Sequence, residues 1–112
     1  MTIEENVKTV VKSIDDKKGE NIKVFYIGDI SPLADYFIIA TGNNHNQTQA
    51  IIDEISANLS KEKIYARQTE GYENGTWILA DYTDFIVHIF NPEAREYYNL
   101  ERLWKDAREI EV

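Results

Sequence analysis

A chain of 112 residues can bury one hydrophobic core, and its 43% hydrophobic and 29% charged residues are typical of a globular protein rather than a disordered one. No apolar run approaches the roughly 20 residues that cross a bilayer, and the N-terminal residues show neither a signal peptide nor an organellar presequence. The chain has no cysteine, which excludes disulfides, thiolate chemistry and cysteine-ligated metals. These features predict a cytoplasmic protein that forms a single domain over residues 1–112 and does not enter a membrane.

The net charge of −8 is concentrated in one part of the chain. Between Glu70 and Glu101, seven acidic residues accompany a single basic one, Arg95. Nucleic-acid binding draws on lysine and arginine to neutralise phosphates, so the sequence predicts no DNA binding and no direct contact with RNA. An acidic surface suits a basic protein partner, although the same charges could serve only to keep the protein in solution.

The first 69 residues are predicted to form two helices and three strands. Thr2 and Glu5 have the spacing of a capping box, ahead of an apolar helical repeat that stops before Gly19. An asparagine after Gly42 can cap a second helix, whose apolar positions run to Leu59. The predicted strands are Ile22–Ile27, Tyr36–Thr41 and Lys63–Thr69, and the last of them, which is half-polar, belongs near an edge of the sheet.

The next segment is predicted to form two apolar strands joined by a tight turn at residues 82–84. Side chains alternate along a strand, which places Trp77 and Asp81 on one face of the first strand and His88 and Phe90 on one face of the second. Nearly every position is apolar, so both faces of the sheet are expected to be covered over much of their area.

A helix rich in aromatic and charged residues follows, with Asn91 as its N-cap and Pro92 at its first position. Its apolar stripe is predicted to continue through Leu103 and Trp104. The predicted order is α-β-β-α-β-β-β-α. This is an α/β (α+β) fold in which one mixed sheet of about five strands is flanked by helices.

Two kinds of enzyme chemistry need residues that this pattern lacks. Metal-dependent nucleotidyl transfer needs converging carboxylates, often two residues apart on a strand, whereas Asp81 and Asp84 are three apart across a turn. Gly42 is followed by two asparagines instead of a serine, and the chain has no phosphate-binding Gly-Lys motif. His45 and His88 lack the partners of a nucleophile or a metal site. The sequence therefore predicts no catalytic residue, metal or cofactor, with a nucleotide-binding or metal-dependent nucleotidyltransferase-like enzyme as the alternative.

Aromatic side chains gather in the last third of the chain, and large rings with a polar tip dominate the hot spots of protein interfaces. Trp77 follows an acidic loop, which favours an interface. Tyr97 and Trp104 could equally fill the core of a small domain. The residues that fit a plain core least well are Trp77, Asp81, Asp84 and His88.

A series of motifs extends over most of the chain from Asp29 to Ala107. They are Ala34–Gly42, Glu70-Gly71, Gly75-x-Trp77-Ile78-Leu79-x-Asp81-Tyr82-x-Asp84, Val87–Phe90 and Arg95-x-Tyr97-Tyr98-x-Leu100-Glu101-x-Leu103-Trp104-x-Asp106-Ala107. In order and spacing they resemble the ribosomal silencing factor family, also called Iojap-like. Two positions depart from that pattern: Thr83 stands where the turn usually has a small residue such as glycine, and Asn43-Asn44 replaces the usual Thr-Ser.

The resemblance implies a non-enzymatic factor that binds large-subunit ribosomal protein number fourteen at the intersubunit face. The small subunit then cannot join, and translation is dampened in nutrient-poor or stationary conditions. The resemblance also implies a nucleotidyltransferase-like fold without catalytic residues, and a possible homodimer. The residues predicted to form the protein-binding surface are Trp77, Asp81, Asp84, His88, Phe90, Tyr98 and Glu101.

Overall fold

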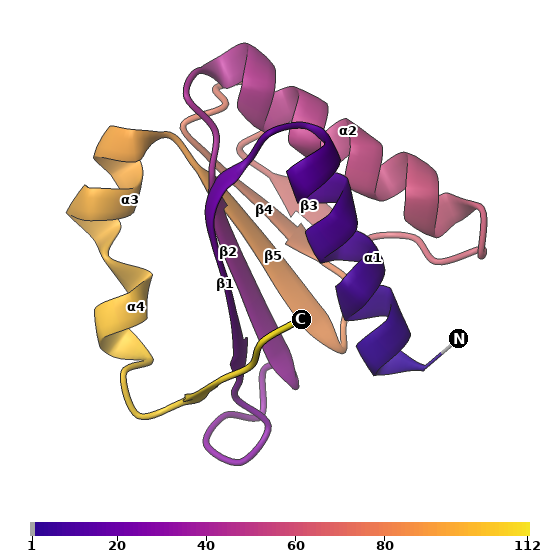
Figure 1. Cartoon of the computed structure of the whole chain (residues 1–112), viewed down its shortest axis with the longest axis vertical. Helices are drawn as coiled ribbons and strands as arrows, with labels where there is room; N and C mark the ends of the chain where they lie inside the picture. The colour runs from indigo at the N-terminus through magenta and orange to yellow at the C-terminus, as the bar shows by residue number, and fades with distance from the viewer. Residues whose placement is uncertain (1) are drawn as a thin grey trace.

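The computed structural model describes residues 2–112 and has one mixed sheet with helices on both sides (Figure 1). In chain order the elements are α1 (Ile3–Asp16), β1 (Glu20–Tyr26), β2 (Tyr36–Thr41), α2 (His45–Ser60), β3 (Gln68–Glu70), β4 (Trp77–Asp81), β5 (Phe85–Phe90), α3 (Pro92–Tyr98), α4 (Leu100–Leu103) and β6 (Arg108–Glu109). The strand order across the sheet is β3-β4-β5-β2-β1-β6. Neighbouring strands are antiparallel except β2 and β5, which run parallel. The predicted mixed sheet with flanking helices is confirmed.

Helices α1 and α2 cover one face of the sheet, because each of them has one apolar side (Figure 1). Thr2 and Glu5 form the predicted capping box at the start of α1. The Asn44 side chain accepts a hydrogen bond of 2.9 Å from the Gln47 N–H and caps α2, as predicted. The buried residues of this first core are Val7, Val10, Ile14, Val24, Ile38, Ala40, Ile51, Ile52, Ile55, Leu59, Ile78, Ala80, Tyr82, Phe85, Val87 and Ile89.

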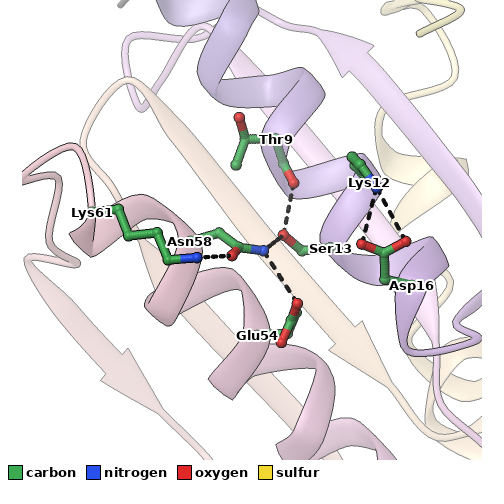
Figure 2. A network of polar contacts seen from close by, with 7 residues as sticks. All are labelled: Thr9, Lys12, Ser13, Asp16, Glu54, Asn58 and Lys61. Atoms are coloured by element: carbon green, nitrogen blue, oxygen red, sulfur yellow. Dashed lines mark hydrogen bonds and ion pairs between the residues drawn. The ribbon is translucent and has the colours of Figure 1, made fainter.

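A polar seam joins α1 to α2 (Figure 2). The Ser13 hydroxyl is completely buried, donates to the Thr9 carbonyl oxygen over 2.7 Å and accepts from Asn58 Nδ2 over 2.8 Å. Asn58 also donates to the Glu54 carboxylate. A buried hydroxyl that lost its partner would be costly, so this pair fixes how α1 lies along α2.

The opposite face of the sheet carries a second, smaller core beneath α3 and α4 (Figure 1). Its buried residues are Phe25, Ile27, Ala34, Phe37, Ile39, Phe90 and Ala94, with Trp77, Ile86, Leu100, Trp104 and Ala107 partly buried around them. These two short helices leave side chains of β3, β4 and β5 exposed or half-exposed on this side. The prediction that both faces are covered therefore holds for the first face and for only part of the second.

The third predicted strand is wrong in its bounds. β3 spans Gln68–Glu70 instead of Lys63–Thr69. After α2 the backbone takes a positive φ of 60° at Lys63, and Ile64 and Ala66 then pack against the first core without pairing in the sheet. Two apolar residues in a polar segment thus mark an irregular stretch anchored to the core, not a strand.

The C-terminal segment also differs from the prediction. The helix is interrupted at Asn99, whose left-handed φ of 45° ends α3 and starts α4. Leu103 is consequently 72% exposed instead of continuing the buried stripe, while Trp104 packs against the second core. The chain then forms a sixth strand, β6, which pairs with Phe25 and Tyr26 of β1 and which the sequence did not predict. No helix within residues 2–112 has both the length and the apolar character to span a bilayer.

Candidate functional site

The uncovered part of the second sheet face forms one continuous surface. Trp77, Leu79 and Ile86 are half-exposed there, and Gln68 and Glu70 of the edge strand β3 are exposed beside them. We call these five residues the open face. Direct pairing of Glu70 with Leu79, and of Gln68 with Asp81, places β3 side chains on the same side as those of β4. The open face therefore has an apolar floor and a polar edge.

Trp77 lies where the open face meets α3. Its ring stacks on Phe90, with centroids 5.0 Å apart, and contacts the Tyr98 ring at 4.6 Å. Phe90 is only 1% exposed, so it supports Trp77 from within the second core. Tyr98 is 46% exposed and extends the aromatic surface onto α3. The structure thus brings these three predicted residues together but leaves only Trp77 and Tyr98 accessible.

His88 lies under Trp77 on the neighbouring strand. Trp77 Nε1 donates a hydrogen bond of 3.1 Å to His88 Nδ1, and the Phe37 ring meets the imidazole edge-on with centroids 4.9 Å apart. Only 4% of His88 is exposed. Burial lowers the pKa of His88 to about 4, because the charged imidazolium would lose its hydration. His88 is therefore a neutral, buried residue near neutral pH.

Asp81 and Asp84 flank the turn between β4 and β5 and have different surroundings. Asp81 is buried; its carboxylate accepts a hydrogen bond from the Arg67 guanidinium and one of 2.8 Å from the Thr83 N–H. Burial acts to raise the pKa of Asp81, but the bonds from Arg67 and Thr83 outweigh it and hold the pKa below its usual value. Asp84 is exposed, and its backbone carbonyl accepts from the Asp35 N–H. Asp81 therefore stabilises the turn, and Asp84 offers a free charge at its surface.

Glu101 of α4 is held by Arg95 of α3. The Arg95 Nε donates to Glu101 Oε1 over 2.9 Å, and a terminal nitrogen of the same guanidinium donates to Thr41 Oγ1 over 2.9 Å. The Arg95 side chain is only 10% exposed. These bonds connect α4, through Arg95 of α3, to the end of β2. Glu101 therefore helps to hold α3 in place and is not mainly a contact residue.

The open face has residues that the sequence analysis did not single out, namely Leu79 and Ile86. Alternation places Leu79 on the same face as Trp77, so the strand pattern contained that signal. The pattern could not predict that α3 and α4 are too short to cover Leu79. Within residues 2–112, no group of three or more His, Asp or Glu side chains is arranged to hold a metal ion.

Comparison with known proteins identifies the family. The family described as "Ribosomal silencing factor during starvation" matches residues 1–112. The chain belongs to this family. It is 39% identical to the ribosomal silencing factor RsfS of Halalkalibacterium halodurans, with 100% of this chain and 96% of the relative aligned. It is 41% identical to the factor of the same name from Bacillus subtilis over 91% of this chain and 90% of the relative.

A solved crystal structure has the same fold. An X-ray crystal structure of a Chromobacterium violaceum protein superimposes with a TM-score of 0.91 at 31% sequence identity, covering 94% of this chain and 88% of that one. The resemblance to the ribosomal silencing factor family is therefore confirmed. A ribosome-related regulatory role follows for the family, and the question for this chain becomes which surface performs it.

Proposed function

We propose that the protein represses translation by binding ribosomal protein number fourteen on the large subunit through the open face, and so blocks the small subunit sterically. The observation that carries the proposal is the half-exposed Trp77 on an apolar floor within the most acidic part of the chain. Family membership supports a ribosomal partner. We also propose that residues 1–112 act as one domain and that the site of action is the cytoplasm.

The chemistry of the surface suits a basic protein. Leu79 and Ile86 offer apolar area on which the aliphatic stems of lysine or arginine can lie, and Glu70 of β3 and Asp84 of the β4–β5 turn are exposed carboxylates. Such rim charges mainly raise the association rate and select the partner, whereas buried aromatic rings supply most of the affinity. The surface thus combines an anchor with a charge pattern that discriminates against acidic partners.

The seven predicted residues divide into two roles under this proposal. Trp77, Tyr98 and Asp84 contact the partner directly, since they are accessible. The remaining four hold these contacts in place from inside the protein: Asp81, His88, Phe90 and Glu101. Substituting a supporting residue should weaken binding through the shape of the surface and should also cost stability.

Occupancy alone is enough for inhibition. A body of 13.0 kDa on the intersubunit face would exclude the bridge that the small subunit needs there, and no substrate is transformed. We therefore propose a non-enzymatic role. A homodimer, which the sequence resemblance implies, stays a prediction that sedimentation of the free protein can test.

Replacing Trp77 by alanine tests the proposal. Trp77→Ala should weaken binding to purified ribosomal protein number fourteen about thirtyfold, because a central aromatic anchor contributes ~2 kcal/mol or more. Tyr65→Ala is the matched control, since Tyr65 is an exposed ring on the segment between α2 and β3. Unchanged affinity of Trp77→Ala, with a native circular dichroism spectrum, would reject the open face as the binding surface.

A further inference from the structure

The hydrogen bond between Trp77 and His88 joins the accessible surface to the interior. Cross-strand pairing sets Trp77 opposite Phe90 and Leu79 opposite His88, so Trp77 and His88 are diagonal neighbours on one face of the sheet. The indole nitrogen can only donate, so Nδ1 of His88 must be the acceptor and the ring hydrogen must be on Nε2. The bond therefore requires one specific tautomer of a neutral imidazole.

The surroundings hold that imidazole in place. The His88 ring lies edge-on to Phe37 and is stacked with Phe90 at a centroid distance of 6.2 Å, and it is almost completely buried. Burial also keeps the pKa of His88 low, so the ring remains an acceptor at neutral pH. Nε2 is buried and has no hydrogen-bond partner among the described residues. An apolar side chain could fill the core at this position without the cost of the unpaired Nε2–H donor. The hydrogen bond that Nδ1 accepts from Trp77 is therefore the contact that a histidine makes here and an apolar residue could not.

The indole gains a fixed orientation from this arrangement. Trp77 is half-exposed, and a half-exposed ring that contacts Phe90 and Tyr98 could still turn about its side-chain torsions. The Nε1 hydrogen bond selects the orientation in which the nitrogen edge points inward and the remaining edge faces the partner. A side chain ordered before binding avoids the entropy cost of being ordered during binding.

We propose that His88 is a positioning residue that presets the Trp77 indole for the ribosomal partner. This inference rests on the proposed function of the open face. It predicts that loss of the acceptor weakens binding about three- to tenfold, the cost of ordering one large side chain on association. His88 itself does not touch the partner.

Two substitutions at His88 separate this role from simple filling of the core. His88→Leu fills the space but cannot accept a hydrogen bond, whereas the Oδ1 of His88→Asn can take the place of Nδ1 as the acceptor. Affinity for purified large ribosomal subunits should fall about three- to tenfold for His88→Leu and recover toward wild type for His88→Asn. In a Trp77→Phe background, where the indole donor is absent, the two substitutions should have equal affinities.

A measurement on the free wild-type protein avoids any folding defect in the variants. Nitrogen-15 NMR at pH 7 should show His88 with its hydrogen on Nε2, and the Trp77 indole N–H should exchange slowly. A hydrogen on Nδ1, or fast exchange of the indole N–H, would overturn the inference. So would an unchanged affinity of His88→Leu for large subunits, or an affinity difference between His88→Leu and His88→Asn that persists in the Trp77→Phe background. If wild-type protein failed to bind large subunits at all, the proposed function would fall together with the inference. Binding by wild type without any effect of His88→Leu would overturn the inference alone.

Discussion

Acidification from pH 7 to pH 5 should destabilise the folded protein through His88. The pKa of this side chain is about 4 in the folded state, against an ordinary value of 6.5 when it is exposed in the unfolded chain. Between these two values the unfolded state binds more protons, so the free energy of unfolding falls as the pH falls. The loss from this one group is about 2 kcal/mol at pH 5 and about 3 kcal/mol at pH 4, and it is absent above pH 7.

Urea denaturation at pH 7 and pH 5 measures the effect. A loss of about 2 kcal/mol should lower the urea midpoint by roughly 1 M, since a small domain loses about 2 kcal/mol of stability per molar urea. His88→Asn has no titrating ring at this position, so its midpoint should change little between the two pH values. His45→Asn, which removes the other histidine of the chain, should keep the wild-type pH dependence. An equal pH dependence in wild type and His88→Asn would refute the buried, neutral imidazole.

Three other substitutions test separate parts of the structure. Thr83 has a left-handed φ of 73°, so Thr83→Gly should raise the free energy of unfolding by about 0.5–1 kcal/mol in urea titration, and a lower value would contradict strain in the turn. A Cβ at Gly71, also at positive φ, would overlap the Trp77 carbonyl oxygen, so Gly71→Ala should cost about 2 kcal/mol or more of stability by the same assay. Asp84→Lys should slow association with the basic partner about three- to tenfold in low salt by stopped-flow fluorescence, while Asp15→Lys on α1 should not, and equal rates would argue against steering.

The helix caps and the central strands could be predicted because their signals are local. Thr2, Asn44 and Asn91 each cap a helix with a side-chain oxygen, as the sequence indicates, and Pro92 is at the first turn of α3. The apolar run of β2 likewise has the predicted bounds, since a strand that is buried on both faces is an unbroken apolar run in the sequence.

The remaining differences depend on contacts between distant segments. β6 forms only because the chain after Trp104 returns to the free edge of β1, and a segment of two paired residues carries no pattern of its own. Asn99 interrupts the last helix because its backbone is left-handed. Asparagine adopts this conformation only at some positions, so the residue type alone does not predict the break.

The sequence predicted which residues belong to the candidate site, but not which of them are accessible and which support the site from inside the protein. Asp81 and His88 have the residue types of an active site or a contact surface, and only their hydrogen bonds, to Arg67 and Trp77 respectively, reveal that they support the structure. Spacing in the sequence places these side chains on one face. It does not determine how far α3 reaches across that face.

Joining of purified ribosomal subunits, followed by light scattering, tests the central claim most directly. Adding this protein to large subunits before the small subunits should reduce the fraction of joined ribosomes, with the effect saturating near one protein per large subunit, and Trp77→Ala should need a much higher concentration. If the subunits joined to the same extent with a saturating amount of the wild-type protein, steric silencing through the open face would be contradicted.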